Sequence, residues 1–271
     1  MPPLWFEALA SIALGVALLC CLTLIIAVAR HPQKMAIMNW VWPITALYFG
    51  PVAIYAFWKL GSPRPQSRRE QSTDQPHERQ TQQRPERETV GSGVADGMRL
   101  GHGWSEEMAR EQPGQRERTR QAPQRPFWQT VWLAVTHCGA GCTLGDIIAE
   151  FAVFFFAWKL AGVDYWPDIL LDFTLAYLLG IIFQYFTIAP MRGISGWPGV
   201  WAAIKADTLS LIAFEVGLFA WMALSAFVFF PGARPDQPVF WLMMQIGMII
   251  GFGASFPMNW WLVRRGIKEQ M

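Results

Sequence analysis

Two cysteines spaced four residues apart are the side chains of this sequence with the clearest potential for chemistry. Cys138 and Cys142 follow His137, and acidic residues continue the same spacing at Asp146 and Glu150. In a helix, residues four apart lie on one side, so two thiols there can share a soft metal ion such as copper(I), with the imidazole as a third ligand. The plainer interpretation is packing, because cysteine is small and weakly polar and the intervening Gly-Ala-Gly is also a packing surface.

Thioether and carboxyl side chains in later apolar segments extend this candidate site. Met244 and Met248 lie one helical turn apart, and thioethers suit copper(I), although methionine also fills cores. Asp172 and Glu215 lie, like the two acids above, inside apolar stretches, where an ionised side chain at the helix centre costs about 2.5–3.5 kcal/mol. We therefore expect the four acids to face a shared interior, to be protonated or to bind a cation.

Other polar and small residues predict how the helices meet. Gly141 and Gly145 permit the close approach of a second helix. Asp207 is expected to cap a helix that begins at Thr208. Five residues inside the spans are expected either to form hydrogen bonds between helices or to line a permeation path: Tyr177, Gln184, Tyr185, Gln245 and Asn259.

The distribution of charge excludes a soluble single-domain protein. Of 271 residues, 53% are hydrophobic and 15% are charged, and residues 61–126 alone hold 12 Arg and 10 acidic residues. The remainder is far poorer in charge than a soluble domain, in which about a quarter of residues are charged. The net charge of +2 and the absence of a strongly basic domain give no sign of a nucleic-acid partner.

Apolar runs of membrane-spanning length predict an all-α polytopic membrane protein with about six transmembrane helices. The expected spans are residues 4–29, 35–58, 127–158, 169–189, 208–230 and 239–263. They divide the chain into an N-terminal two-helix hairpin (1–60), a charged linker (61–126) and a four-helix bundle (127–271). The prolines at 43 and 51 are expected to bend the second span, and the composition of the linker predicts disorder.

Basic residues near the span ends predict the orientation. With six spans, thirteen Lys and Arg residues lie on the side of the linker and four on the other side. The positive-inside rule then places both termini and the linker in the cytoplasm. An odd number of spans would move the N-terminus outside and leave the C-terminus unchanged.

Several enzymatic signatures are missing from the sequence. It contains no glycine-rich phosphate loop, no HExxH zinc motif and no GxSxG nucleophile motif. With one histidine well inside a span, a single chain also lacks the pair of histidines that a bis-imidazole haem requires. These absences favour a protein that is not an enzyme.

The cysteine segment lies within a run that resembles a bacterial family. The run from Thr136-His137-Cys138-Gly139-Ala140-Gly141-Cys142 to Glu150 is similar to the signature of the family called domain of unknown function 4396. Further matching segments are 184–186, 188–193, 205–210, 214–217, 243–248 and 259–262. The resemblance covers roughly Phe127 to Lys268, and the segment from Asn39 to Tyr48 also resembles the family. It implies a membrane architecture and assigns no catalytic role.

The leading functional hypothesis is binding or transport of a soft transition-metal ion, copper(I) above all, by a multi-pass protein of the bacterial cell inner membrane. His137, Cys138 and Cys142 would be primary ligands, Met244 and Met248 transit ligands, and the buried acids would balance charge or carry protons. Three alternatives are a proton-coupled carrier of a small solute, a thiol–disulfide oxidoreductase, and an accessory subunit without chemistry of its own. The expected partners are the lipid bilayer and either further copies of the chain or a larger membrane complex.

Overall fold

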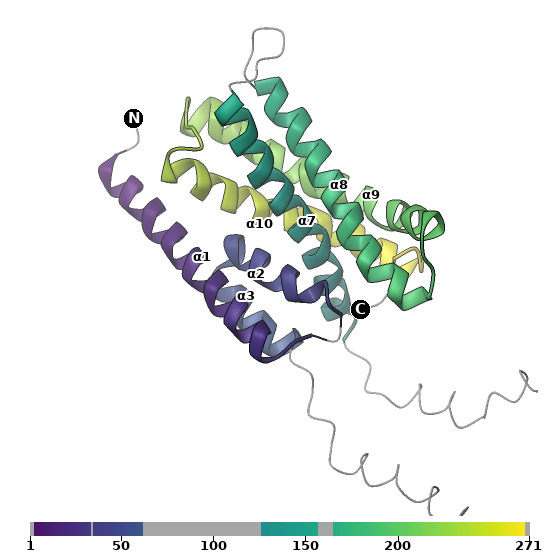
Figure 1. Cartoon of the computed structure of the whole chain (residues 1–271). Helices are drawn as coiled ribbons and strands as arrows, with labels where there is room; N and C mark the ends of the chain where they lie inside the picture. Colours follow the sequence, from purple (N-terminus) through teal and green to yellow (C-terminus); the bar gives the residue numbers. More distant parts are fainter. Residues whose placement is uncertain (1–2, 34, 62–125, 157–164, 269–271) are drawn as a thin grey trace, which may run out of the picture. The chain divides into compact units, whose positions relative to one another are not determined.

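The computed structural model describes residues 3–33, 35–61, 126–156 and 165–268, and side chains from 169 onward in the last of these ranges. These ranges are helical apart from short turns (Figure 1). The predicted linker falls almost entirely outside them. The helices are α1 (Leu4–Arg30), α2 (Met38–Phe49), α3 (Pro51–Ala56) with a π-helical turn (Phe57–Gly61), α7 (Phe127–Phe156), α8 (Tyr165–Arg192), α9 (Trp197–Leu224) with a π-helical turn (Ser225–Phe229), and α10 (Pro238–Arg264).

Five of these helices are long and apolar enough to cross a membrane: α1, α7, α8, α9 with its π-helical turn, and α10. Their outer faces expose large apolar side chains, for example Leu19, Leu22 and Ile26 of α1. Contiguous apolar surface of this extent is unfavourable in water and favourable against lipid. The prediction of an all-α polytopic membrane protein is confirmed.

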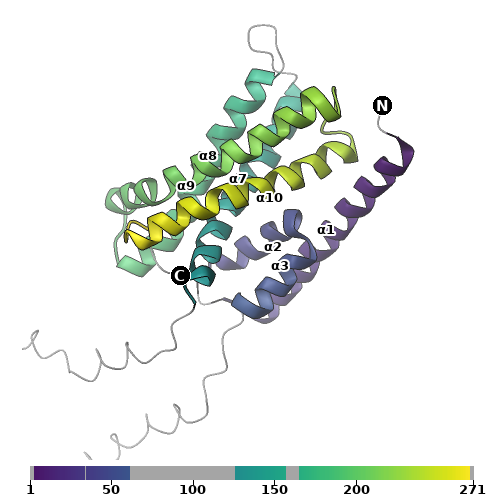
Figure 2. The same cartoon turned by 180° about the vertical axis from the view of Figure 1, so that it is seen from behind.

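The expected second span, residues 35–58, differs from the prediction, because it folds back on itself instead of forming one continuous helix. The reversal occurs at Gly50, which has φ +54°, a region that favours glycine, and Pro51 then begins α3. Trp42 of α2 consequently packs against Phe57, with ring centroids 5.6 Å apart, and against Gly61. In one straight helix residues 42 and 61 would be about 28 Å apart. The segment enters the bundle and returns to the same end (Figures 1 and 2).

Ring contacts show which helix ends lie together. His31, after α1, contacts Trp58 after α3, and Phe127 of α7 contacts Trp260 of α10. We call this the linker-side end, because residues on both sides of the linker lie there. At the far end, Phe6 of α1 stacks on Phe230, which follows α9, with centroids 4.8 Å apart. The beginning of α1 and the end of α10 therefore lie at opposite ends of the bundle, which differs from the expectation that both termini share one side.

Helix α7 lies at the centre and packs against α2, α8, α9 and α10. Its approach to α8 depends on small residues, as predicted for Gly141 and Gly145. A Cβ atom added to Gly141 would lie 2.7 Å from the Cα of Gly180, and one added to Gly145 would lie 2.6 Å from the Cα of Ala176. The backbones are thus in direct contact, and the prediction of close packing is confirmed.

Helix α9 begins about ten residues earlier than the sequence predicts. Gly196, with φ +65°, and Pro198 set its start, and the helix continues through the segment expected to be a connection. Asp207 therefore lies inside the helix, buried, and does not cap it. The prediction was wrong because residues 199–207 contain both apolar and charged side chains, and charged side chains ordinarily lie at the membrane boundary.

Candidate functional site

The four-residue series of α7 is buried along its whole length. Cys138, Cys142 and Asp146 expose no surface, and Glu150 is 7% exposed. At 1.5 Å per residue, this series extends about 18 Å along the helix axis. A stripe of thiol and carboxyl groups therefore runs through the protein interior and not along a lipid-facing side.

The two cysteines share a packed cluster with two methionines of α10. Cys138, Cys142, Met244 and Met248 belong to one set of contacting buried residues, and none is more than 3% exposed. The Met248 Sδ atom lies 3.6 Å from the hydroxyl of Thr143, so α10 reaches α7 directly beside Cys142. All four cysteines of the chain are free thiols in this structure. We call these two thiols and two thioethers the sulfur cluster; soft ligands of this kind suit a soft metal ion.

Two oxygen-bearing side chains border the sulfur cluster. Glu215 of α9 and Tyr48 of α2 are electrostatic neighbours of Cys142. Neither carboxyl oxygen of Glu215 has a hydrogen-bond partner, although the thiol of Cys142 is near. Tyr48 reaches this position because Gly139 has no side chain: a Cβ atom there would lie 2.9 Å from the tyrosine hydroxyl. Tyr48 was not among the predicted site residues, and its only sequence signal was the family resemblance of the segment that ends with it.

The buried acids converge from three helices. Asp146 of α7 is an electrostatic neighbour of Glu215 on α9, of Asp172 on α8 and of Glu150 on its own helix. Neither oxygen of Asp146 has a hydrogen-bond partner, and all four acids are buried. Like charges this close disfavour joint ionisation in a dehydrated interior. The arrangement is therefore suited to holding protons.

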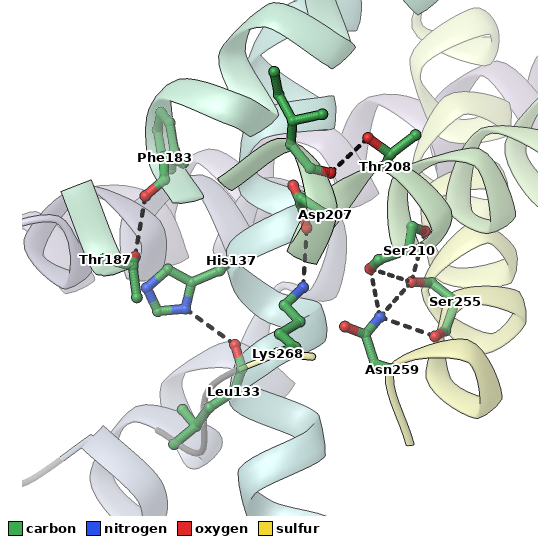
Figure 3. Close-up of polar contacts among 11 residues, drawn as sticks. Leu133, His137, Phe183, Thr187, Asp207, Thr208, Ser210, Ser255, Asn259 and Lys268 are labelled. Carbon is green, nitrogen blue, oxygen red and sulfur yellow. Dashed lines mark hydrogen bonds and ion pairs between the residues drawn. The ribbon is translucent and has the colours of Figure 1, made fainter. Parts of the chain in front are cut away.

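His137 lies about 100° around the helix from Cys138, and one nitrogen of its ring is bonded to the backbone of α7. Its Nδ1 donates a hydrogen bond to the carbonyl of Leu133 at 3.1 Å, while its Nε2 has no partner. The charged side chain near it is Lys268, at the linker-side end (Figure 3). Among the residues that the structure describes, no three His, Cys, Asp or Glu side chains are grouped as a metal site would require. His137 and the two thiols are therefore not brought together as three donors.

Four of the five polar residues expected between helices join a helix to a neighbouring element through a hydrogen bond. The Asn259 amide donates to Ser210 Oγ of α9 at 2.6 Å, within a network that also includes Ser255 (Figure 3). Gln245 donates to the carbonyl of Leu47 at 2.8 Å and thereby joins α10 to α2. Two further contacts join α8 to its neighbours: Tyr177 Oη lies 3.1 Å from Thr208 Oγ1, and Tyr185 Oη accepts a bond from the backbone of Gly196. Gln184 is buried, and neither atom of its amide has a partner.

A buried ion pair between α9 and the chain after α10 was not predicted. Lys268 Nζ lies 2.9 Å from Asp207 Oδ1, and both side chains are fully buried. The sequence offered no positive signal for this pair. Lys268 is the last of three basic residues after an apolar span, and such residues ordinarily remain in water.

Comparison with known proteins adds one match. The family described as Domain of unknown function (DUF4396) matches residues 127–268, which contain α7 to α10 and Lys268. No curated protein and no solved structure matches the chain. The matched range is the one over which the sequence resembles that family.

Proposed function

This chain belongs to the DUF4396 family, and we propose that its α7–α10 bundle binds a soft metal ion, copper(I) above all, at the sulfur cluster. The observation that carries the proposal is that Cys138, Cys142, Met244 and Met248 all belong to one buried cluster between α7 and α10. Thiolate and thioether ligands select copper(I) over hard cations, and copper(I) accepts as few as two or three ligands. The two thiols are the primary ligands in this proposal.

The neighbouring carboxyl groups support a metal-bound state. Cysteine binds metal as the thiolate, so binding releases protons that a nearby base can accept. Glu215 is beside Cys142, and Asp146 lies one turn farther along α7. In the proposed mechanism these acids receive the protons from the thiols. The two methionines then bind the metal in turn as it moves along α10. His137 has no role as a ligand in this conformation.

The test is the copper content of the purified full-length chain after loading with copper(I) under reducing conditions. We expect near-stoichiometric copper in the wild type and its loss in Cys138→Ser/Cys142→Ser. The matched control is Cys20→Ser/Cys21→Ser, which removes the other two thiols, both in α1, and should leave copper unchanged. Equal copper in the wild type and the α7 variant would refute the proposal.

A second candidate function is a proton-coupled carrier of a small solute, favoured by the partnerless buried carboxyl groups of Asp146 and Glu215. In this case the cysteines only pack, and the acids carry the proton. Proton uptake into liposomes that contain the protein would then be lost in Glu215→Gln and retained in Cys138→Ser/Cys142→Ser. The reverse pattern favours the metal site.

We place the protein in the bacterial cell inner membrane, with the linker-side end in the cytoplasm. The linker-side end carries most of the basic residues near span ends, the bias that orients membrane proteins. Folding back of the 38–61 segment adds Arg30, the last residue of α1, to this side. This addition strengthens the proposed orientation.

A further inference from the structure

The buried ion pair between Lys268 and Asp207 lies apart from the sulfur cluster and is unexplained by it. Lys268 Nζ and Asp207 Oδ1 are 2.9 Å apart, and neither side chain is exposed (Figure 3). Burying two charges costs more free energy than most such pairs recover, and an apolar pair is commonly as stable or more stable. A buried pair of this kind therefore calls for a reason other than stability.

The chain turns back after α10 in a way that brings Lys268 inside. Gly266 adopts φ +68°, and the backbone N–H groups of Ile267 and Lys268 donate to the carbonyl of Leu262 at 3.0 and 3.3 Å. This is the hydrogen-bonding pattern of a helix that ends at a left-handed glycine. Arg264 and Arg265, just before the turn, are exposed and lie over tryptophan rings. Lys268 alone of these three cationic side chains enters the bundle.

Two buried side chains on α8 and α9 leave hydrogen-bonding atoms unused. Asp207 Oδ2 has no partner, and neither amide atom of Gln184 has one, although Gln184 is only 1% exposed. Gly180 relates the two residues, which lie on the packed helices α8 and α9. Asp207 Oδ2 lies 3.2 Å from the position of a Cβ atom on Gly180, and Gln184 follows Gly180 by one turn on the same face of α8. Gln184 thus lies on the linker side of Asp207, where Lys268 enters.

We propose that Asp207 and Gln184 form a binding site for a small monovalent cation, and that the ammonium group of Lys268 is the chain's own occupant of this site. A carboxylate and an amide oxygen are hard ligands, unlike the sulfur cluster, and one carboxylate balances one positive charge. An external cation binds when the turn at Gly266 opens and Lys268 withdraws. This inference goes beyond the proposed function and uses none of its ligands.

Competition between potassium and Lys268 tests the site in the wild-type chain, because a potassium ion is about as large as an ammonium group. Lysine acylation in detergent, read by mass spectrometry, reports the accessibility of Lys268, with exposed Lys205 as the internal control. We expect slow acylation of Lys268 and a several-fold, saturable increase in its rate with potassium chloride. Tetramethylammonium chloride at equal ionic strength should give no increase. Equal rates in the two salts would overturn the proposal.

The variant Gln184→Leu separates a cation site from a structural ion pair. It retains Asp207 and Lys268, so Lys268 should remain protected, while the effect of potassium should be lost. A full potassium effect in Gln184→Leu would remove Gln184 from the site and contradict the proposal. Asp207→Asn should expose Lys268 in either salt, and if that variant does not fold, Gln184→Leu still decides. No copper enters these measurements, so their failure is distinct from failure of the metal site.

Discussion

Glu215 places a carboxyl group in the core of the α7–α10 bundle without a hydrogen bond to either oxygen. A buried polar group left unpaired costs about 1–3 kcal/mol. We therefore expect Glu215→Met, which keeps the length of the side chain and removes its polar atoms, to raise the free energy of unfolding by an amount in that range. Reversible unfolding in detergent, compared with the wild type, measures the change.

The matched control for this prediction is Glu7→Met, at the partly exposed start of α1. A substitution in such a position should change stability by no more than about 0.5 kcal/mol. A loss of stability in Glu215→Met would mean that the carboxyl group holds the helices together. The roles proposed for Glu215 as a proton acceptor or proton carrier would then no longer be supported.

Met248 and Met243 offer a matched pair on α10, because both are buried and only Met248 belongs to the sulfur cluster. Replacement of methionine by leucine conserves volume and generally costs less than about 1.5 kcal/mol of stability. We expect Met248→Leu to weaken copper(I) binding about tenfold, or about 1.4 kcal/mol, and Met243→Leu to leave it unchanged. Competition against a copper(I) chelator measures both affinities. Equal affinities in the two variants would exclude the thioether of Met248 as a ligand.

Residue spacing predicted part of the candidate site because helical periodicity is local. Cys138, Cys142 and Asp146 lie on one buried side of α7, as a four-residue repeat requires. Tyr48 and Lys268 could not be found in this way, since the first enters over Gly139 from a distant helix and the second depends on the turn at Gly266. Such contacts are set by tertiary packing, which spacing along the chain does not encode.

At the scale of elements, the contact between α7 and α8 depends on Gly145 and Gly141. We expect Gly145→Ala to destabilise the protein by about 1–3 kcal/mol, because the new Cβ atom would lie 2.6 Å from the Cα of Ala176 and the helices would have to separate. Unfolding in detergent measures the loss. The separation should also weaken binding at the neighbouring sulfur cluster.

The control for this substitution is Gly253→Ala, in the middle of α10. No atom lies within 4 Å of the position of a Cβ atom on Gly253, so alanine should be neutral or stabilise the helix by up to about 1 kcal/mol. If both alanine variants have the same stability, close packing at Gly145 does not hold α7 against α8.

The helices themselves were predictable where apolar runs are long, and their boundaries were less so. The sequence predicted a bend at the prolines of the second span, whereas the structure shows a reversal at Gly50. A reversal needs partners for both arms, here the packing of Trp42 against Phe57. The early start of α9 was missed because Asp207 is buried with a lysine that follows α10, 61 residues farther along the chain. Both differences arise from contacts between distant residues, which the hydropathy along the sequence does not show.

For the molecule as a whole, the reversal at Gly50 changes the expected number of membrane crossings. Five of the described helices are long and apolar enough to span, and the segment 38–61 returns to the linker-side end. Helix α1 therefore runs from the far end, where Phe6 meets Phe230, to the linker-side end, where His31 meets Trp58. With an odd number of crossings, the N-terminus and the C-terminus lie on opposite sides of the membrane.

We accordingly expect an epitope tag at the N-terminus and one after Arg234, in the turn between α9 and α10, to be accessible from the same side of the membrane. Tags in the linker and at the C-terminus should be accessible from the other side, which we propose to be the cytoplasm because the basic residues near span ends are concentrated there. Antibody binding to sealed spheroplasts before and after permeabilisation measures each tag separately. Protection of the N-terminal tag together with the C-terminal tag would mean that the segment 35–58 crosses completely. Tyr48 would then not lie beside the thiols, because its position in this fold depends on the return of α3 along α2.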